Sequence, residues 1–146
     1  VKAIIFDWIG TLYQRDRGAF ESSEKVLREL KADYKLGLVS LASNGIHSRK
    51  EELESSGLGD YFDSVVIERA KKSRHYLRCM KEMKVKPEET VIVDDRTIRG
   101  IKVGNELGCQ TFWIEEGEYS HETPNKETGN PTYIIKSVED LLTLLK

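Results

Sequence analysis

The chain of 146 residues has no long apolar run and only two cysteines. A membrane-spanning helix needs about 20 consecutive apolar residues, and every apolar stretch here is much shorter. Cys79 lies in a predicted helix and Cys109 at the start of a predicted strand, so we expect both as reduced thiols in the core. Because no signal peptide precedes the first apolar segment, we expect a cytoplasmic location without membrane attachment.

An excess of charge of one sign is also lacking. Lys and Arg number 23 against 25 Asp and Glu, which gives a net charge of −2. Proteins that are drawn electrostatically to nucleic acids or anionic membranes carry a marked positive excess. The composition therefore provides no charge that would steer the chain to either partner. The length fits one domain with a proper core, so we expect residues 1–146 to form a single domain.

What the sequence does have is a regular alternation of short apolar segments, typical of buried strands, with amphipathic segments, typical of helices. This alternation predicts an α/β protein of three layers, a Rossmann-like α/β/α fold whose central parallel sheet is covered by helices on both faces. The predicted strands are 1–6, 36–42, 64–67, 90–93, 110–114 and 133–135. The predicted helices are 22–31, 48–57, 72–83, 98–107 and 138–145, with a small flap at 13–18 and a long loop at 115–131.

Acidic and hydroxyl residues occur where several of these strands end. Asp7 follows the first strand, the pair Asp94–Asp95 ends the fourth, and either Ser40 or Ser43 marks the end of the second. The carboxyl ends of parallel strands share one edge of the sheet, where α/β proteins bind their ligands. Carboxylates this close cannot all stay ionised without a cation, and hard oxygen ligands suit Mg²⁺ together with a substrate phosphate. The pattern predicts metal-assisted phosphoryl transfer, with Asp7 as candidate nucleophile.

Several motifs resemble those of the haloacid dehalogenase superfamily of phosphohydrolases, and the resemblance covers essentially the whole chain. Phe6-Asp7-Trp8-Ile9-Gly10-Thr11-Leu12 is similar to the first motif, and Val91-Ile92-Val93-Asp94-Asp95-Arg96 resembles the acidic fourth motif. The lead-in Lys86-Pro87-Glu88-Glu89-Thr90, the segment 57–63 and the closing elements also look like the family. Motifs in this order and spacing imply the family's fold and its Mg²⁺-dependent hydrolysis of phosphorylated substrates.

The resemblance implies roles for individual residues. Asp7 matches the nucleophile that forms an aspartyl-phosphate and also binds Mg²⁺. Asp95 matches the main metal ligand of the fourth motif, with Asp94 beside it as a ligand or water-holder. The family also draws a metal ligand from the backbone carbonyl two residues after the nucleophile, which here is the carbonyl of Ile9.

The phosphate-binding residues are less narrowly defined. Lys72 resembles the lysine of the third motif, which neutralises the phosphate and the nucleophile, and the spacing favours it over the adjacent Lys71. For the hydroxyl of the second motif, strand length favours Ser40, whereas the following Asn-Gly and the start of a helix favour Ser43. Of the two we prefer Ser40.

Two acidic positions of the family pattern are missing. Phosphatases of the family carry a second aspartate two residues after the nucleophile, which protonates the leaving oxygen and then activates water. That position is Ile9, which can do neither. A further acidic position of the fourth motif corresponds to Arg99 or Gly100, depending on where a gap is placed. Losing a general acid/base costs on the order of 10²–10⁴ in rate.

The intervals between motifs leave no room for the cap domain that many members insert. The site is therefore expected to be open, with the flap residues Arg15, Asp16 and Arg17 as its nearest cover, so that the substrate could be macromolecular. These features favour a Mg²⁺-dependent phosphatase that is slow because of Ile9. The alternatives are a non-catalytic relative that binds a phosphate or a partner, which Ile9 would suit, and a dehalogenase-like hydrolase.

Overall fold

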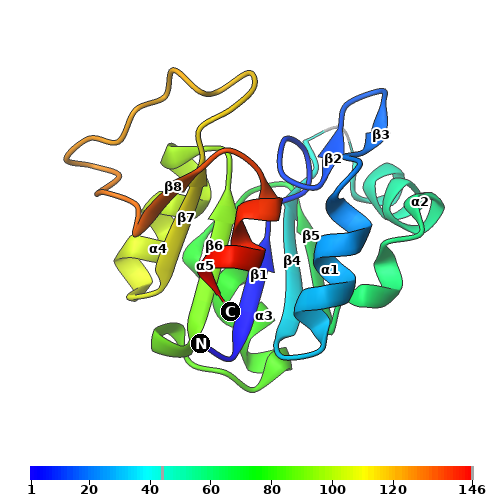
Figure 1. Cartoon of the computed structure of the whole chain (residues 1–146), viewed down its shortest axis with the longest axis horizontal. Coiled ribbons are helices and arrows are strands. Elements are labelled where there is room, and N and C mark those ends of the chain that lie inside the picture. Colours follow the sequence, from blue (N-terminus) through cyan, green and yellow to red (C-terminus); the bar gives the residue numbers. More distant parts are fainter. Residues whose placement is uncertain (44, 146) are drawn as a thin grey trace.

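A computed structural model describes residues 1–43 and 45–145. Its centre is a six-stranded sheet in the order β5-β4-β1-β6-β7-β8, with every neighbouring pair parallel (Figure 1). The four residues of β1 are fully buried, as expected for a strand that is covered on both faces. The strands are β1 (Ala3–Phe6), β4 (Lys35–Leu41), β5 (Ser64–Glu68), β6 (Thr90–Asp94), β7 (Gln110–Ile114) and β8 (Tyr133–Ile135).

Helices cover both faces of this sheet, so the predicted three-layer fold is confirmed. The helices are α1 (Ser23–Lys31), α2 (Ile46–Ser56), α3 (Ser73–Met83), α4 (Lys102–Leu107) and α5 (Leu141–Leu144). Side chains of α1, α2 and α5 share one apolar core with Ile4 and Phe6 of β1. Side chains of α3 and α4 share a second core with Ala3 and Ile5, which point to the other face of the same strand.

Close packing of α3 on the sheet depends on a glycine in β4. A Cβ added to Gly37 would lie 2.6 Å from Cys79 Sγ and 2.9 Å from Met83 Cε, so this position has no room for a side chain. Both Cys79 and Cys109 are buried free thiols, as the sequence predicts. The helix thus lies directly against the strand that leads to the second motif.

The order of the strands brings the predicted site residues to one edge. β1 lies between β4 and β6, and Ile5 pairs with Gly37 on one side and with Ile92 on the other. The carboxyl ends of these three central strands are therefore adjacent, and Asp7 and Asp94 come from neighbouring strands. The N–H of Asp7 donates to the carbonyl of Val93 at 3.0 Å, which extends the ladder to the end of β1.

The connections follow the sequence expectations with local differences. The expected flap forms a small antiparallel hairpin, β2 (Tyr13–Gln14) with β3 (Gly18–Ala19). The helix expected over 48–57 begins two residues earlier, at Ile46, with Gly45 at its N-cap and no side-chain cap. The segment expected to begin a helix at residue 98 is a π-helix, η3 (Thr97–Ile101). Single turns of 3₁₀-helix are η1 (Gly59–Tyr61), η2 (Pro87–Glu89) and η4 (Val138–Asp140).

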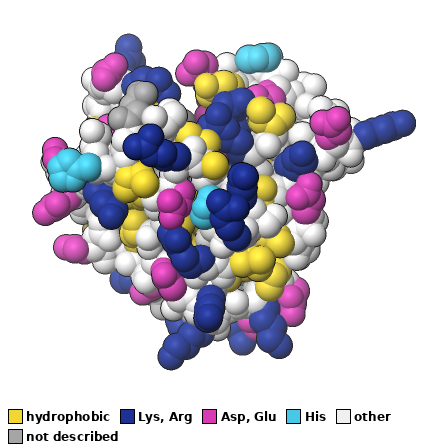
Figure 2. Space-filling model, turned by 180° about the vertical axis from the view of Figure 1, so that it is seen from behind, with side chains coloured by type: hydrophobic (Ala, Val, Ile, Leu, Met, Phe, Trp, Pro, Cys, Tyr) yellow, Lys and Arg dark blue, Asp and Glu magenta, His cyan; other side chains and the backbone are white. Residues whose placement is uncertain are grey.

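Within the described residues no further domain is inserted between these elements. The long loop between β7 and β8 extends beyond the sheet near the carboxyl ends of the strands, and the β2–β3 hairpin lies on the other side of that edge (Figure 1). None of the described helices combines the length and the apolar character that crossing a membrane requires. On the face shown in Figure 2, acidic, basic and apolar side chains are interspersed.

Candidate active site

Asp7 sits at the end of β1, at the start of a tight turn. The carbonyl of Trp8 accepts hydrogen bonds from the N–H groups of Thr11, Leu12 and Tyr13, which fold the chain back on itself. The hydroxyl of Thr11 donates to Asp7 Oδ2 at 3.3 Å. Gly10 has φ +87°, which favours glycine. A Cβ at this glycine would also lie 2.1 Å from Asp95 Oδ2, so the turn can approach the acidic pair only without a side chain.

Asp94 is fixed by the backbone that follows β6. The N–H of Arg96 donates to Asp94 Oδ1 at 3.0 Å, and the N–H of Gly100 donates to Asp94 Oδ2 at 2.9 Å. A Cβ at Gly100 would lie 2.4 Å from that same oxygen. The π-helix places Gly100 there, and insertions of this type in helices are frequent at functional sites. The carbonyl of Asp95 accepts a hydrogen bond from Trp113 Nε1 of β7 at 2.9 Å.

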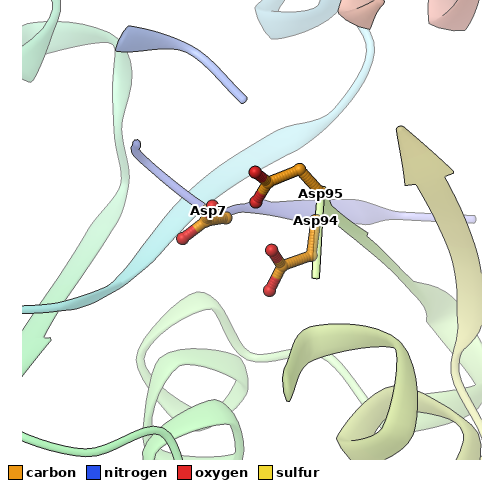
Figure 3. Close-up of side chains that lie close together, drawn as sticks. All are labelled: Asp7, Asp94 and Asp95. Carbon is orange, nitrogen blue, oxygen red and sulfur yellow. The ribbon is translucent and has the colours of Figure 1, made fainter. Parts of the chain in front are cut away.

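Three carboxylates meet at this edge. Asp7, Asp94 and Asp95 each offer an oxygen, and these oxygens lie within 4.8 Å of one another (Figure 3). Asp94 and Asp95 are buried, and the side chain of Asp7 is 11% exposed. Asp95 Oδ1 is buried and has no hydrogen-bond partner, which is costly for a carboxylate oxygen. Hard oxygen donors with an unsatisfied buried oxygen fit a small divalent cation such as Mg²⁺.

The lysine at this site is Lys71, not Lys72. Lys71 Nζ lies 2.5 Å from Asp7 Oδ1 and 3.2 Å from Asp94 Oδ2, and its side chain is 2% exposed. Lys72 is exposed and forms the N-cap of α3, where its backbone N–H donates to His75 Nδ1 at 3.1 Å. The preference for Lys72 was wrong. Lys71 and Lys72 are adjacent, and the exact position at which α3 starts decides which of them faces the carboxylates.

The charges of the cluster influence one another strongly because they are buried. Burial raises the pKa of Asp7, and the charge of Asp94 raises it further against the opposing effect of Lys71. Burial also disfavours ionisation of Asp94, but Lys71 and the N–H of Arg96 outweigh it and keep that pKa below its ordinary value. Burial, with the charges of Asp7 and Asp94, raises the pKa of Asp95 to about 10. Without a cation, the cluster therefore favours the protonated form of Asp95.

The pKa of Lys71 is also set by burial and by the neighbouring charges, which act in opposite directions. Burial by itself would lower this pKa, but the charges of Asp7 and Asp94 raise it above the ordinary value. Lys71 therefore stays charged over the whole neutral range. A fixed ammonium group between two carboxylates neutralises part of the cluster and leaves a positive charge beside Asp7.

Asp7 opens into a cleft of about 550 Å³. Ser43 lines this cleft, whereas Ser40 is buried in β4 and its hydroxyl accepts a hydrogen bond from Arg49 Nη1 at 2.5 Å. Of the two candidate hydroxyls, only Ser43 is therefore placed where a phosphate could reach it, so the preference for Ser40 does not agree with the structure. The half-buried side chain of Ile9 lines the same cleft, and the role of its carbonyl as a metal ligand stays a prediction.

A second hollow of about 450 Å³ adjoins the first. Ile9, Arg15, Asp95 and Tyr119 line both hollows. Apolar side chains of Phe20, Ile114 and Val138 contribute to the second one. Ile9 thus lies at the junction between the cleft that contains Asp7 and a more apolar hollow.

Several residues of the cleft wall were not found from the sequence. Arg49 is fixed by Ser40, by the carbonyl of Leu41 at 3.1 Å and by Glu52 at 3.3 Å. Glu52 also accepts a hydrogen bond from Trp8 Nε1 at 2.8 Å, which links α2 to the turn after β1. Trp8 and Glu52 are 44 residues apart in the chain, so no local motif marks this pair.

The loop between β7 and β8 adds another part of the wall. Arg96 forms an ion pair with Glu122 at 3.0 Å, and its guanidinium lies 3.8 Å from the centre of the Tyr119 ring. The hydroxyl of Thr97 donates to the carbonyl of Glu122 at 2.8 Å. These contacts anchor the loop on η3 and bring Tyr119 to the cleft.

Comparison with known proteins agrees with this geometry. Residues 4–114 match the family model of haloacid dehalogenase-like hydrolases. A glyceraldehyde 3-phosphate phosphatase of Methanocaldococcus jannaschii is 32% identical over 129 residues, which cover 84% of this chain and 54% of that protein. The chain thus spans about half the length of the curated relatives that it matches.

Solved structures show the same fold. L-2-haloacid dehalogenase from Xanthobacter autotrophicus superimposes with a TM-score of 0.83 at 12% identity, over 99% of this chain and 98% of that one. A protein of Bacillus subtilis solved bound to magnesium gives a TM-score of 0.74 at 21% identity, over 88% and 56% of the two chains. The family match extends from β1 to β7 and includes the three carboxylates and Lys71. The chain therefore belongs to the family of haloacid dehalogenase-like hydrolases.

Proposed function

We propose that this protein is a Mg²⁺-dependent phosphatase that hydrolyses phosphate monoesters through an aspartyl-phosphate on Asp7. The position of Asp7 is the observation that carries the proposal. Its carboxylate lies at the floor of an open cleft, between the ammonium of Lys71 and the hydroxyl of Thr11. The matched relatives named as phosphatases support the reaction class.

The residues of the chain suggest how the reaction proceeds. A carboxylate oxygen of Asp7 attacks phosphorus, the bond from phosphorus to the ester oxygen breaks, and the ester oxygen leaves with the electron pair of that bond and takes a proton from water, since Ile9 cannot supply one. Lys71 and the hydroxyl of Ser43 offset charge on the phosphoryl oxygens. Water then hydrolyses the acyl phosphate, which releases phosphate and restores Asp7.

Magnesium would be held by Asp7, Asp94 and Asp95, and by the carbonyl of Ile9 if the family pattern holds. When bound, the ion supplies charge stabilisation for the phosphoryl group. Such a cation would favour the ionised form of Asp95, whose pKa burial and the charges of Asp7 and Asp94 raise in the cation-free cluster.

Replacement of the nucleophile tests the proposed reaction. Asp7→Asn should abolish phosphatase activity, because an amide is a poor nucleophile and a weaker cation ligand. Activity on p-nitrophenyl phosphate with Mg²⁺ measures the loss, and mass spectrometry of acid-quenched enzyme looks for phosphate on Asp7. Asp60→Asn, exposed on η1, is the matched control and should keep its activity. Turnover that survives in Asp7→Asn would show that water or another group attacks directly.

Two adjacent lysines provide a second test. Lys71→Gln should reduce activity by about 10²-fold or more, whereas Lys72→Gln should stay within about twofold because its side chain is exposed. Lys71→Gln should also lower the free energy of unfolding by about 3 kcal/mol in EDTA at neutral pH, since it leaves buried carboxylates unpaired. The raised pKa means that the stabilisation by Lys71 is fully present below its ordinary value of 10.5. Equal effects of the two substitutions would remove Lys71 from the site.

The metal site is tested by thermal unfolding. Mg²⁺ with orthovanadate should raise the melting temperature of the unmodified protein by about 5–10 °C at concentrations ~100 times Kd. Asp95→Asn should lose this rise. Without Mg²⁺ this variant should be at least as stable near neutral pH, because it removes a carboxyl whose pKa burial raises. A rise of the same size in Asp95→Asn would exclude the carboxylate cluster as the metal site.

Ile9 tests why the enzyme would be slow. Ile9→Asp should raise activity on alkyl phosphates by about 10- to 1,000-fold, because an acid at this position can protonate a poor leaving group. The gain should be smaller on aryl phosphates, whose leaving groups need less protonation. The matched control is Ile9→Asn, because asparagine has nearly the same shape as aspartate but no titratable proton. If Ile9→Asp folds, binds Mg²⁺ and gains nothing on any ester, the non-catalytic alternative becomes the better explanation of the site.

A further inference from the structure

The cleft is lined by more arginine side chains than are held in ion pairs. Arginines 15, 49, 96 and 99 all line the hollow that contains Asp7. Arg49 is paired with Glu52, and Arg96 is paired with Glu122. Among the described residues, no carboxylate lies within ion-pair distance of Arg15 or Arg99, and neither side chain has a hydrogen-bond partner.

Arg99 is the more informative of the two. Its side chain is partly buried, on the π-helix that also brings Gly100 to Asp94. Arg15 is exposed at the tip of the flap, next to the exposed Asp16, which offsets part of its charge. A partly buried guanidinium without an anion is a costly arrangement, and it presents five donors in the fork that suits a carboxylate or a phosphate.

The three carboxylates at the base of the cleft can be neutralised without Arg99. Lys71 already neutralises one of the three carboxylates, and the divalent cation of the proposed function would balance the other two. The reacting phosphoryl group would lie on Asp7, close to Lys71. A cleft of about 550 Å³ holds a much larger molecule than one phosphate group.

We infer that Arg99, assisted by Arg15, binds a second anionic group of the substrate, so that the preferred substrates are small phosphate esters with a carboxylate or a second phosphate at the other end. This inference rests on the proposed function, which places the reacting phosphate at Asp7. A charge-assisted hydrogen bond from a partly buried arginine contributes about tenfold or more to affinity.

A substrate series of constant length tests the inference. Propyl phosphate is compared with its analogues that end in a carboxylate or a phosphate instead of the methyl group. The ratio of kcat/KM for each charged analogue to that for propyl phosphate should be about 10 or more, and Arg99→Gln should reduce this ratio about tenfold. Arg17→Gln removes an equal charge from the flap, at a position that does not line the cleft, and should leave the ratio unchanged. Preference for the carboxylate or for the phosphate identifies the second group, and either one supports the inference.

Binding of the corresponding phosphonates, measured by calorimetry with Mg²⁺, separates the two proposals because phosphonates are not hydrolysed. Tighter binding of the charged phosphonates that depends on Arg99, without turnover of any ester, would support the anion site and contradict the phosphatase. Turnover with equal kcat/KM for all three esters would overturn the anion site and leave the phosphatase intact. An equal loss for all three esters in Arg99→Gln would also overturn it, since Arg99 would then act on the transferred phosphate.

Discussion

The meeting of three carboxylates at the ends of two neighbouring strands is the constraint on which the site depends. Two of them are buried, and like charges at this distance in a poorly solvated position strongly disfavour ionisation. One buried ammonium group, that of Lys71, contacts Asp7 and Asp94 and offsets part of this charge. Asp95 Oδ1 is left without a hydrogen-bond partner. The cluster is therefore incomplete in its own charges, and this incompleteness is what makes it suitable for a cation.

The backbone around the cluster is shaped by the same constraint. The turn after β1 and the π-helix after β6 each place a glycine against a carboxylate oxygen, at Gly10 and Gly100. At both positions a methyl group would overlap that oxygen, and Gly100 uses the space to donate its N–H to Asp94. A regular α-helix starting at this point would direct its N–H groups differently. In the π-helix the N–H of Gly100 is placed to stabilise the charge of the buried Asp94.

The fold and the acidic residues could be predicted from the sequence, because buried strands are marked by short apolar runs and parallel strands bring their ends to one edge. The lysine could not, since Lys71 and Lys72 differ only by their position relative to the N-cap of α3. The serine was ambiguous for a related reason. The sequence does not show at which residue β4 ends. In the structure β4 ends at Leu41, so Ser40 is a buried strand residue that accepts a hydrogen bond from Arg49. Ser43 follows the strand and lines the cleft. Ion pairs such as Arg96–Glu122 join distant segments and leave no local pattern.

In the proposed reaction, the site would supply only one of two kinds of catalysis that usually occur together. Electrostatic stabilisation would depend on Asp7, Lys71 and the acidic pair. Contacts between side chains and with the backbone hold Asp7, Lys71 and Asp94, whereas only the backbone carbonyl of Asp95 is held, by Trp113. Proton transfer to the leaving group would require a titratable side chain where Ile9 lies, at the junction of the two hollows. Electrostatic stabilisation is usually the larger contribution to rate, and general acid catalysis adds about 10²–10⁴. In the proposed phosphatase, a site that keeps the first and lacks the second should therefore discriminate among esters by the acidity of the leaving group, and the proposed arginine site would add a preference for a second anionic group.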